Sequence, residues 1–517
     1  MIKAPTVELA PAESNRSNKS RGAGAVSIGA VIVFGLALAW TYNWGGYLHR
    51  FTQGISLYIG LYIVEFTLYL GACYAVFRTA KSRSRNVTLT LLLVIAAFSA
   101  VFHSQLFGQP PYLSTDAYRY IWDGRVQAAG INPFRYIPDS PELEPLRDTR
   151  IFPNINRADY APTPYPPVAQ MIYLAVYLIS PFSVTAFKVA VSLFDMVTIL
   201  AVAAVLMRLR MDPARAIIFA WHPLLMWEGA HSGHVDPAFI ACLALALLAW
   251  SYRKPTLVGV ALALATLIKL YPMMLLPVFL LDPEDLNRTY MGSVIRQGGV
   301  SIRDVLVPIW ARIRAVVFNR QSLKTIAAFL ITIVVCYLPY LTVGSGVFGY
   351  LSGYFEEEGF VDSGGRYFPL ALVRKLIPVP TNLYSALAVL ALGGMALYWL
   401  VRVKRDARDI AVGSLAMIGL YLVLTTPRYP WYFCWIIPFL CFAPRMGWLY
   451  LTGATVLLYT LWFIPNQYPN LPLWLGAAMY IPTLGLLAWS RFRGRDPLEL
   501  ADGDGGMARG SPLAANA

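Results

Sequence analysis

Repeated apolar runs constrain this chain more than any other feature, because many reach the about 20 residues with which a helix crosses a bilayer. Within lipid every backbone N–H and C=O must be bonded internally, so apolar runs of this length form helices. Hydrophobic residues make up 57% of the chain and charged residues only 14%, which excludes an ordinary soluble composition. The sequence therefore predicts an all-α, polytopic integral membrane protein with about 12–14 transmembrane helices.

The net charge of +14 comes from basic residues in short loops and tails, which is how the cytoplasmic side of a membrane protein is marked. We interpret these charges as topology signals and expect membrane lipids, and no nucleic acid, as partners. The predicted division has disordered cytoplasmic tails at 1–23 and 491–517, a transmembrane domain at 24–490, a cytoplasmic loop at 282–324, and large external loops at 107–165 and 344–380.

Two apolar segments have lengths that do not fit one straight crossing. The first is broken at Ser180-Pro181, which predicts a partial helix at about 167–180 before a full span at about 184–207. The second, 255–281, carries Lys269 in its middle and predicts two half-length helices around that residue. Irregular backbone at membrane depth is tolerated only beside a cavity, so we expect Lys269 to border one.

The first external loop begins with a predicted helix that carries one ionisable face. Ser114 or Thr115 can cap it, and Gly130 follows its expected end at about Ala129. Such a helix suits the bilayer surface, either as the edge of a membrane cavity or as a structural interfacial helix. Helical spacing puts Asp116, Arg119, Tyr120 and Asp123 on one face, and Tyr118, Ile121, Trp122 and Arg125 roughly on the other.

Further ionisable residues gather on the same predicted side of the membrane. The spacing His231-x-x-His234-x-Asp236 could bind a metal, line a cavity with hydrogen-bonding groups, or form a turn in which Asp236 caps the next helix. Lys269 lies at membrane depth, where charged residues usually serve a function, although it could also snorkel to the interface. Arg366 and Arg428 lie in two later external segments.

A carboxylate at the outer interface with cations beneath it suits a lipid-phosphate substrate. The phosphate needs Arg, Lys or His donors, and the lipid tail can lie between helices. A carboxylate above the phosphate can take a proton from an acceptor hydroxyl as general base. The sequence holds no Gly-rich phosphate loop and no P-loop lysine signature, which argues against direct use of a nucleoside triphosphate.

At these residues the sequence resembles the GT-C superfamily of membrane glycosyltransferases. It is most similar to bacterial polyprenyl-phosphate-mannose-dependent mannosyltransferases and their glycosyltransferase family 87 relatives. The matching motifs follow one another in the family's order between about residues 88 and 440. They are Asp116-Ala-Tyr-Arg-Tyr-Ile-Trp-Asp-Gly-Arg125 with Gly130-Ile-Asn-Pro133, Thr163-Pro-Tyr-Pro-Pro-Val-Ala-Gln170, His222-Pro-Leu and Gly233-His-Val-Asp236, Lys269-Leu-Tyr-Pro272, and Pro430-Trp-Tyr432.

The resemblance implies a GT-C-type helical bundle in which Asp116 is the general base of an inverting transfer. It implies that Asp236 matches a second acidic motif near the donor or a metal, and Lys269 and Arg428 are candidates to bind the donor phosphate. Trp122, Tyr165 and Trp431 are candidates to stack on sugar rings. The remaining candidate substrate-binding residues are Arg119, Asp123, Arg125, His231, His234, Tyr271, Arg366 and Tyr432.

The expected activity is transfer of a hexosyl group, with mannose preferred, from a polyprenyl-phosphate sugar to an external glycan or glycolipid acceptor. Another lipid-linked sugar such as glucose or arabinose, and a lipid or glycan transporter, are the alternatives. We expect the protein in the bacterial cytoplasmic (inner) membrane with its active site on the external, periplasmic face. No cofactor is expected, and a requirement for a divalent metal is left open.

Overall fold

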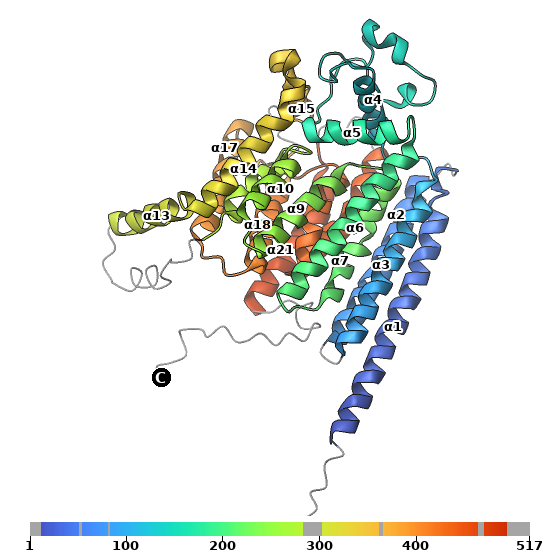
Figure 1. The fold of residues 1–517 in the computed structure, drawn as a ribbon, viewed down its shortest axis with the longest axis vertical. Coiled ribbons are helices and arrows are strands. Elements are labelled where there is room, and N and C mark those ends of the chain that lie inside the picture. The colour runs from blue at the N-terminus through green and yellow to red at the C-terminus, as the bar shows by residue number, and fades with distance from the viewer. Residues whose placement is uncertain are drawn as a thin grey trace, which may run out of the picture.

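The computed structural model describes residues 12–50, 54–80, 83–282, 302–360, 366–463 and 470–493. Every regular element in these ranges is a helix or a helical turn, and no strand occurs in them (Figure 1). The prediction of an all-α fold is therefore confirmed. Residues 1–11 and 494–517, most of the two predicted tails, lie outside the described residues, and α1 (Ala12–Gly45) begins inside the predicted N-terminal tail.

Within the described ranges, nine helical segments are long and apolar enough to cross a membrane. Four shorter apolar helices lie among them. The predicted polytopic helical membrane protein is confirmed, with nine candidate spans in the described ranges where about 12–14 transmembrane helices were predicted. The long segments are Val26–Arg50, Gly54–Arg78, Arg85–Phe107, Val184–Arg208, Arg320–Glu357, Thr381–Val401, Ala407–Thr425, Met446–Phe463 and Leu473–Arg493, and the shorter ones are Pro167–Ile179, Asp236–Ser251, Pro255–Thr266 and Pro430–Leu440.

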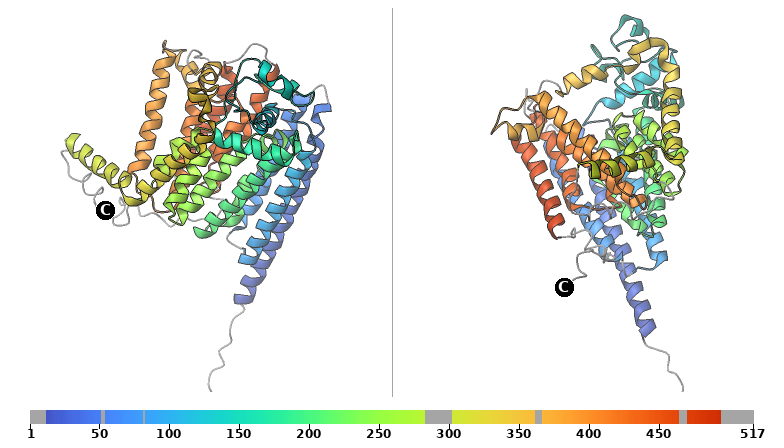
Figure 2. Two further views of the ribbon diagram at one scale, coloured as in Figure 1. Left: turned by 45° about the horizontal axis from the view of Figure 1, so that its top comes forward. Right: turned by 90° about the vertical axis from the view of Figure 1, so that its left-hand side faces the viewer.

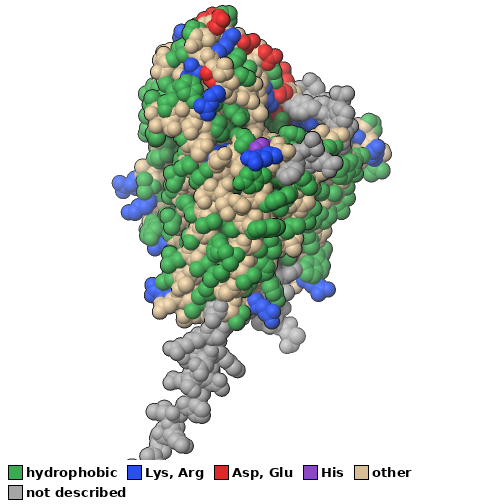
Figure 3. All heavy atoms as spheres, turned by 90° about the vertical axis from the view of Figure 1, so that its right-hand side faces the viewer, with side chains coloured by type: hydrophobic (Ala, Val, Ile, Leu, Met, Phe, Trp, Pro, Cys, Tyr) green, Lys and Arg blue, Asp and Glu red, His purple; other side chains and the backbone are tan. Residues whose placement is uncertain are grey.

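Large apolar side chains cover the outside of this bundle, as lipid contact requires. Leu93, Leu200 and Leu390 each expose more than half of their surface, which would be costly in water over so wide an area. Figure 3 shows apolar side chains spread over one face of the bundle, with acidic side chains gathered at its upper end. The chain is thus an integral, multi-pass membrane protein.

The N-terminal half forms a row of packed helices. Helices α1, α2 (Gly54–Arg78) and α3 (Arg85–Phe107) lie together at one side, as Figure 1 shows. From α3 the packing continues through α6 (Val184–Arg208), α9 (Asp236–Ser251), α10 (Pro255–Thr266) and α14 (Arg320–Tyr337). Gly259 allows the last of these contacts, because a Cβ there would lie 2.2 Å from the Thr325 carbonyl oxygen of α14.

The C-terminal half packs against this row and contributes the other wall of the site. Helices α17 (Thr381–Val401) and α18 (Ala407–Thr425) are followed by η9 (Pro430–Ile436) and α19 (Ile437–Leu440). The chain then crosses back through α20 (Met446–Ala454) and η10 (Thr455–Phe463) to α21 (Leu473–Arg493). Helix α13 (Ile302–Val317), in the predicted cytoplasmic loop, projects from the side of the bundle in Figures 1 and 2.

The predicted partial helix and the first of the two half-length helices predicted around Lys269 are present, and they meet; the second is shorter than predicted, a 3-10 turn and one turn of α-helix. Helix α5 (Pro167–Ile179) ends at Ser180, and α10 ends at Thr266, just before Lys269. The chain continues through η7 (Tyr271–Leu275) and α11 (Leu276–Phe279). At the start of α5, the backbone N–H groups of Val168 and Ala169 donate to the carbonyl oxygen of Leu267. The N···O distances are 3.0 Å and 3.2 Å. One broken helix thus satisfies the free backbone donors of the other.

Helix α4 (Asp116–Ala128) lies across the end of the bundle and packs on α5. Gly124 makes the close approach possible, because a Cβ there would lie 2.5 Å from the Tyr173 carbonyl oxygen. The helix ends as predicted, with Gly130 at a φ of 77°. The loop that follows builds its own small core on the outer side of α4, and α15 (Leu351–Glu357) stands beside it. We refer to this end of the molecule as the α4 end.

Candidate active site

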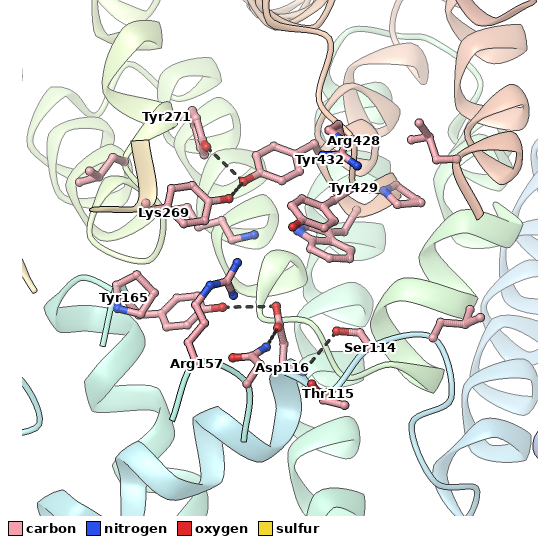
Figure 4. A pocket seen from close by; sticks show the side chains of 18 of the residues that line it. Ser114, Thr115, Asp116, Arg157, Tyr165, Lys269, Tyr271, Arg428, Tyr429 and Tyr432 are labelled. Atoms are coloured by element: carbon pink, nitrogen blue, oxygen red, sulfur yellow. Dashed lines mark hydrogen bonds between the residues drawn. The ribbon is translucent and has the colours of Figure 1, made fainter. Parts of the chain in front are cut away.

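A cavity of about 520 Å³ opens at the α4 end, between the two halves of the bundle. It is bordered by the start of α4, the loop that follows α4, the turn around Lys269, α15, η9 and η10, so six parts of the chain build it. Its polar lining consists of Ser114, Thr115, Asp116, Asn156, Arg157, Tyr165, Lys269, Tyr271, Tyr354, Arg428, Tyr429, Trp431, Tyr432 and Tyr459 (Figure 4).

Asp116 is the cavity's carboxylate. It is the first residue of α4, where the helix dipole favours a negative charge. Asn156 donates to its Oδ1 at 2.6 Å, and the hydroxyl of Tyr165 donates to Oδ2 at 3.4 Å. The Tyr120 hydroxyl also donates to Oδ2, at 3.5 Å, so three neutral donors hold the carboxylate, and 14% of the side chain is exposed. A carboxylate held in this way can accept a proton from a hydroxyl group.

Lys269 and Asp236 form an ion pair beneath this carboxylate. The ammonium of Lys269 lies 2.7 and 2.9 Å from the two oxygens of Asp236, and Trp435 donates its indole N–H to Asp236 at 2.8 Å. Lys269 reaches the cavity, whereas Asp236 is 1% exposed and lies behind it. The break in the helix at Lys269 therefore places the ammonium group of Lys269 in the cavity, while the carboxylate of its partner Asp236 is buried in the cavity wall.

The opposite wall is aromatic. Trp431 stacks on Tyr429 with ring centroids 4.6 Å apart, and Lys269 lies 5.3 Å from the centroid of Tyr432. The Tyr432 hydroxyl is 2.5 Å from that of Tyr354 and 3.4 Å from that of Tyr271, so three phenols form one cluster. Arg428 borders the same wall, and Figure 4 shows this group facing Asp116 across the cavity.

Arg157 supplies another cation. Its guanidinium binds Glu357 of α15 through two nitrogens, at 2.9 and 2.7 Å from Oε1. Burial disfavours the charged guanidinium, but the hydrogen bonds to Glu357 and nearby negative charges outweigh it, so the pKa of Arg157 is raised above its ordinary value. Arg157 has a φ of 55°, a left-handed conformation that is uncommon for a residue with a side chain and often marks functional sites.

Six predicted site residues line this cavity besides Asp116, and several others lie behind its walls. Those that line it are Tyr165, Lys269, Tyr271, Arg428, Trp431 and Tyr432. His234 and Asp236 stand directly behind cavity residues: His234 Nε2 lies 3.8 Å from Asp116 Oδ2, and Asp236 holds Lys269. The structure thus brings together the motifs from which the site was predicted.

Four side chains of α4 that were predicted to bind substrate do not reach the cavity. Arg119 and Asp123 bind each other at 2.9 Å, and Arg119 also bonds the carbonyl of Ala161, so this pair fastens the loop. Trp122 is 1% exposed and packs on Phe152 in the core of the loop. Arg125 pairs with Asp148 at 2.8 Å.

Two further predicted residues also serve the framework. His231 is 2% exposed and packs against the ring of Trp227. Arg366 pairs with Glu358 at 2.7 Å outside the cavity lining. Within the described ranges, no three side chains of His, Cys, Asp or Glu come together as a metal site would require. The spacing of His231, His234 and Asp236 therefore does not gather those three side chains around one point.

Sequence reasoning missed Asn156, Arg157, Tyr354, Tyr429 and Tyr459. The first two lie in irregular loop, where no periodicity assigns a side chain to a face. Arg157 meets Glu357 across 200 positions of sequence, and such a contact depends on the folded loops. Tyr429 had a usable signal, since it directly precedes Pro430-Trp-Tyr432, a motif that the resemblance had already marked.

A multi-pass helical bundle with a carboxylate facing cations and stacked aromatic rings has the make-up of a membrane glycosyltransferase. The comparison with protein families agrees: the MptA_B family, described as alpha-(1->6)-mannopyranosyltransferase, N-terminal domain, matches residues 21–282. This match spans half of the chain and includes Asp116, Asp236 and Lys269. The chain belongs to this family and is a glycosyltransferase that transfers mannose. No curated protein and no solved structure matches it.

Proposed function

We propose that the protein transfers a mannosyl group from polyprenyl-phosphate mannose to a glycan or glycolipid acceptor, with inversion, and with Asp116 as general base. The observation that carries this proposal is the placement of Asp116 opposite Lys269 and Arg428 in one cavity. A linkage of the α-(1→6) type is the natural expectation from the description of the family.

The proposed step breaks one bond and forms another without a nucleotide. The acceptor hydroxyl attacks the anomeric carbon of mannose as its proton passes to Asp116. The bond from that carbon to the phosphate oxygen breaks, and the lipid phosphate departs with the electron pair. Lys269, Arg428 and the phenols of Tyr271, Tyr354 and Tyr432 stand where they would stabilise the negative charge that grows on the phosphate.

The cavity also has an apolar border that fits a lipid donor. Leu458, Leu461 and Trp462 of η10 line it, and Trp462 is 58% exposed. These side chains lie on an apolar crossing segment, so a polyprenyl chain could leave the cavity toward lipid while its phosphate stays near Lys269. The aromatic pair Tyr429 and Trp431 offers ring faces on which a sugar can stack.

We further propose that the cavity faces the outside of the cytoplasmic membrane. Basic residues stand where helices begin or end at the opposite end of the bundle, and the positive-inside rule assigns that end to the cytoplasm. They are Arg78, Arg85, Arg208, Arg253, Arg402 and Arg405.

Transfer by the purified protein in nanodiscs tests the activity. Radiolabelled polyprenyl-phosphate mannose is offered with an extract of cell-envelope lipids and glycans, with and without chelator. We expect label in a new product. Asp116→Asn should lower turnover by about 10²- to 10⁴-fold, the usual contribution of a general base, while donor binding persists. The chelator arm decides whether a divalent metal is needed.

Asp139→Asn is the matched control, because Asp139 lies in the same loop, pairs with Arg147 and is half exposed away from the cavity. It should keep wild-type turnover. Wild-type turnover in Asp116→Asn would exclude Asp116 as the base. Transfer from a glucose or arabinose lipid phosphate, but not from the mannose donor, would correct the donor.

A further inference from the structure

A buried carboxylate and a buried imidazole stand in line behind Asp116. Glu228 belongs to the π-helical turn η6 (Met226–His231), and His234 lies between that turn and α9. They are 1% and 0% exposed, so neither can meet a substrate directly. Burying two such groups is costly unless they are paired, and π-helical turns recur at functional sites. Proposed transfer chemistry at Asp116 does not by itself account for either group.

A chain of contacts runs from Tyr459 in one wall of the cavity, through the buried Glu228 and His234, to Asp116. The Tyr459 hydroxyl donates to Glu228 Oε1 at 2.6 Å, and Glu228 Oε2 lies 3.2 Å from His234 Nδ1. The backbone carbonyl of Glu228 lies 3.0 Å from the same nitrogen. A carbonyl can only accept, so Nδ1 carries the proton, and the Glu228 carboxylate stands beside this hydrogen bond without sharing it. The other ring nitrogen, Nε2, is thereby turned toward α4.

On the side that faces α4, the imidazole of His234 lies close to the carboxylate of Asp116 and to Ser114, which binds the backbone N–H of Asp116. Nε2 lies 3.1 Å from Ser114 Oγ and 3.8 Å from Asp116 Oδ2, and Ser114 Oγ accepts the backbone N–H of Asp116 at 3.2 Å. Gly233, with a φ of 74°, brings this turn close: a Cβ there would lie 3.3 Å from Ala117 Cβ.

The same imidazole touches the aromatic wall. Its ring centroid lies 4.0 Å from that of Trp431, with 30° between the planes. Burial opposes charge on the imidazole, but the carboxylates of Glu228, Asp116 and Asp236 near it raise the pKa of His234 above its ordinary value. His234 is therefore in contact with the proposed base on one side and a sugar-stacking candidate on the other.

We propose that Glu228 and His234 are positioning residues: Glu228 orients the imidazole, and the imidazole holds Asp116 in the geometry needed for proton removal from the acceptor. This inference rests on the proposed role of Asp116 as general base. Groups that orient a reacting side chain typically change turnover by about 10- to 100-fold, because the barrier is sensitive to small displacements. Binding of the lipid phosphate, on the other side of the cavity, should be spared.

Glu228→Gln tests the proposal. The amide keeps the volume and an oxygen for the Tyr459 hydroxyl but removes the charge facing His234. We expect kcat to fall at least about tenfold while KM for the donor stays within about twofold. The matched control is Glu65→Gln: Glu65 is another fully buried carboxylate, bonded to Trp227 at 2.6 Å, without contact to His234 or Asp116. It should leave kcat unchanged.

Two outcomes would overturn the proposal. One is an unchanged kcat in Glu228→Gln, or a loss equal to that in Glu65→Gln. The other is a rise in the KM for the donor at constant kcat, which would show that Glu228 and His234 act on donor binding. If Glu228→Gln does not fold, Ser114→Ala carries the test: it deletes the hydroxyl between His234 and Asp116 at the partly exposed end of the chain of contacts, and the same fall in kcat is expected.

A double variant separates this inference from the proposed function. In an Asp116→Asn background, Glu228→Gln should cause no further loss, because its target is already gone. A further loss would show that the pair acts elsewhere. If Asp116→Asn alone keeps wild-type turnover, the proposed base is wrong. If Asp116→Asn is inactive and Glu228→Gln is fully active, only the positioning role fails.

Discussion

At the scale of single residues, two of the cavity's cations, Lys269 and Arg157, are each paired with a carboxylate. Lys269 was predicted as a cation at membrane depth, and the structure gives it Asp236 as a partner through both carboxylate oxygens. Arg157 is similarly bound to Glu357. Removing one member of a buried pair leaves the other uncompensated, which costs more than the pair itself contributes. Single substitutions here will therefore mix stability with function.

Lys269→Met should be destabilised by about 3 kcal/mol or more and should also raise KM for the donor. The double variant Lys269→Met/Asp236→Asn removes both charges, and Trp435 can still donate to the new amide oxygen. It should recover most of the lost stability but not the donor affinity. Denaturant unfolding in detergent and donor titration measure the two quantities. Equal stability of the single and the double variant would contradict the coupling of this pair.

Individual side chains show where helical periodicity succeeds and where it fails. The ionisable face of α4 was predicted correctly, since Asp116, Arg119 and Asp123 do share it. Only Asp116 borders the cavity, because the loop after α4 folds back and binds Arg119 through the carbonyl of Ala161. Trp122 was predicted to stack on sugar, yet Leu143 and Ile151 of that loop enclose it. A pattern on one helix does not reveal what the next loop covers.

At the scale of elements, the site depends on α4 lying close to α5. Gly124→Ala would put a methyl group 2.5 Å from the Tyr173 carbonyl oxygen and 2.9 Å from Tyr177 Cβ. Backbone cannot yield cheaply, so α4 should shift, at a cost of about 1–3 kcal/mol. Because Asp116 begins this helix, we expect at least about a tenfold loss of transfer.

Gly60→Ala is the control for that substitution, because Gly60 lies in a helix, α2, with open space where its Cβ would be. Transfer assays and thermal unfolding of both variants make the comparison. Gly60→Ala should behave as wild type. Full activity of Gly124→Ala would show that the position of Asp116 does not depend on the packing of α4 on α5.

The broken helices were predictable for a physical reason. The 27 residues of 255–281 are too many for one straight crossing and too few for two, and a lysine stood in their middle. Length and charge together therefore located the break at Lys269. The contact between the start of α5 and the end of α10 was not predictable. It joins the backbone N–H of Val168 to the backbone carbonyl of Leu267, and every residue except proline carries both groups, so the sequence does not mark the pair.

At the scale of the whole molecule, the two ends of the bundle should face different compartments. A cysteine at Glu144, exposed in the loop after α4, should react with a membrane-impermeant thiol reagent on intact cells. A cysteine at Arg405, exposed beyond α17, should react only after the membrane is opened. The wild-type protein gives the background of its own cysteines. The reverse pattern would place the cavity in the cytoplasm.

The paired cations have a consequence for how a cycle of transfer would end. With the proposed donor, the lipid-linked sugar would enter as a phosphodiester with about one negative charge, and the spent carrier would leave as a monoester with about 1.5 to 2 negative charges at pH 7. Such a product would bind the cations of the cavity more tightly than the substrate does, and it would inhibit the enzyme. Asp236 competes with that phosphate for Lys269, and Glu357 competes with it for Arg157. When these carboxylates pair again with Lys269 and Arg157, the lipid phosphate product would dissociate faster. The enzyme would then be free to bind its next donor.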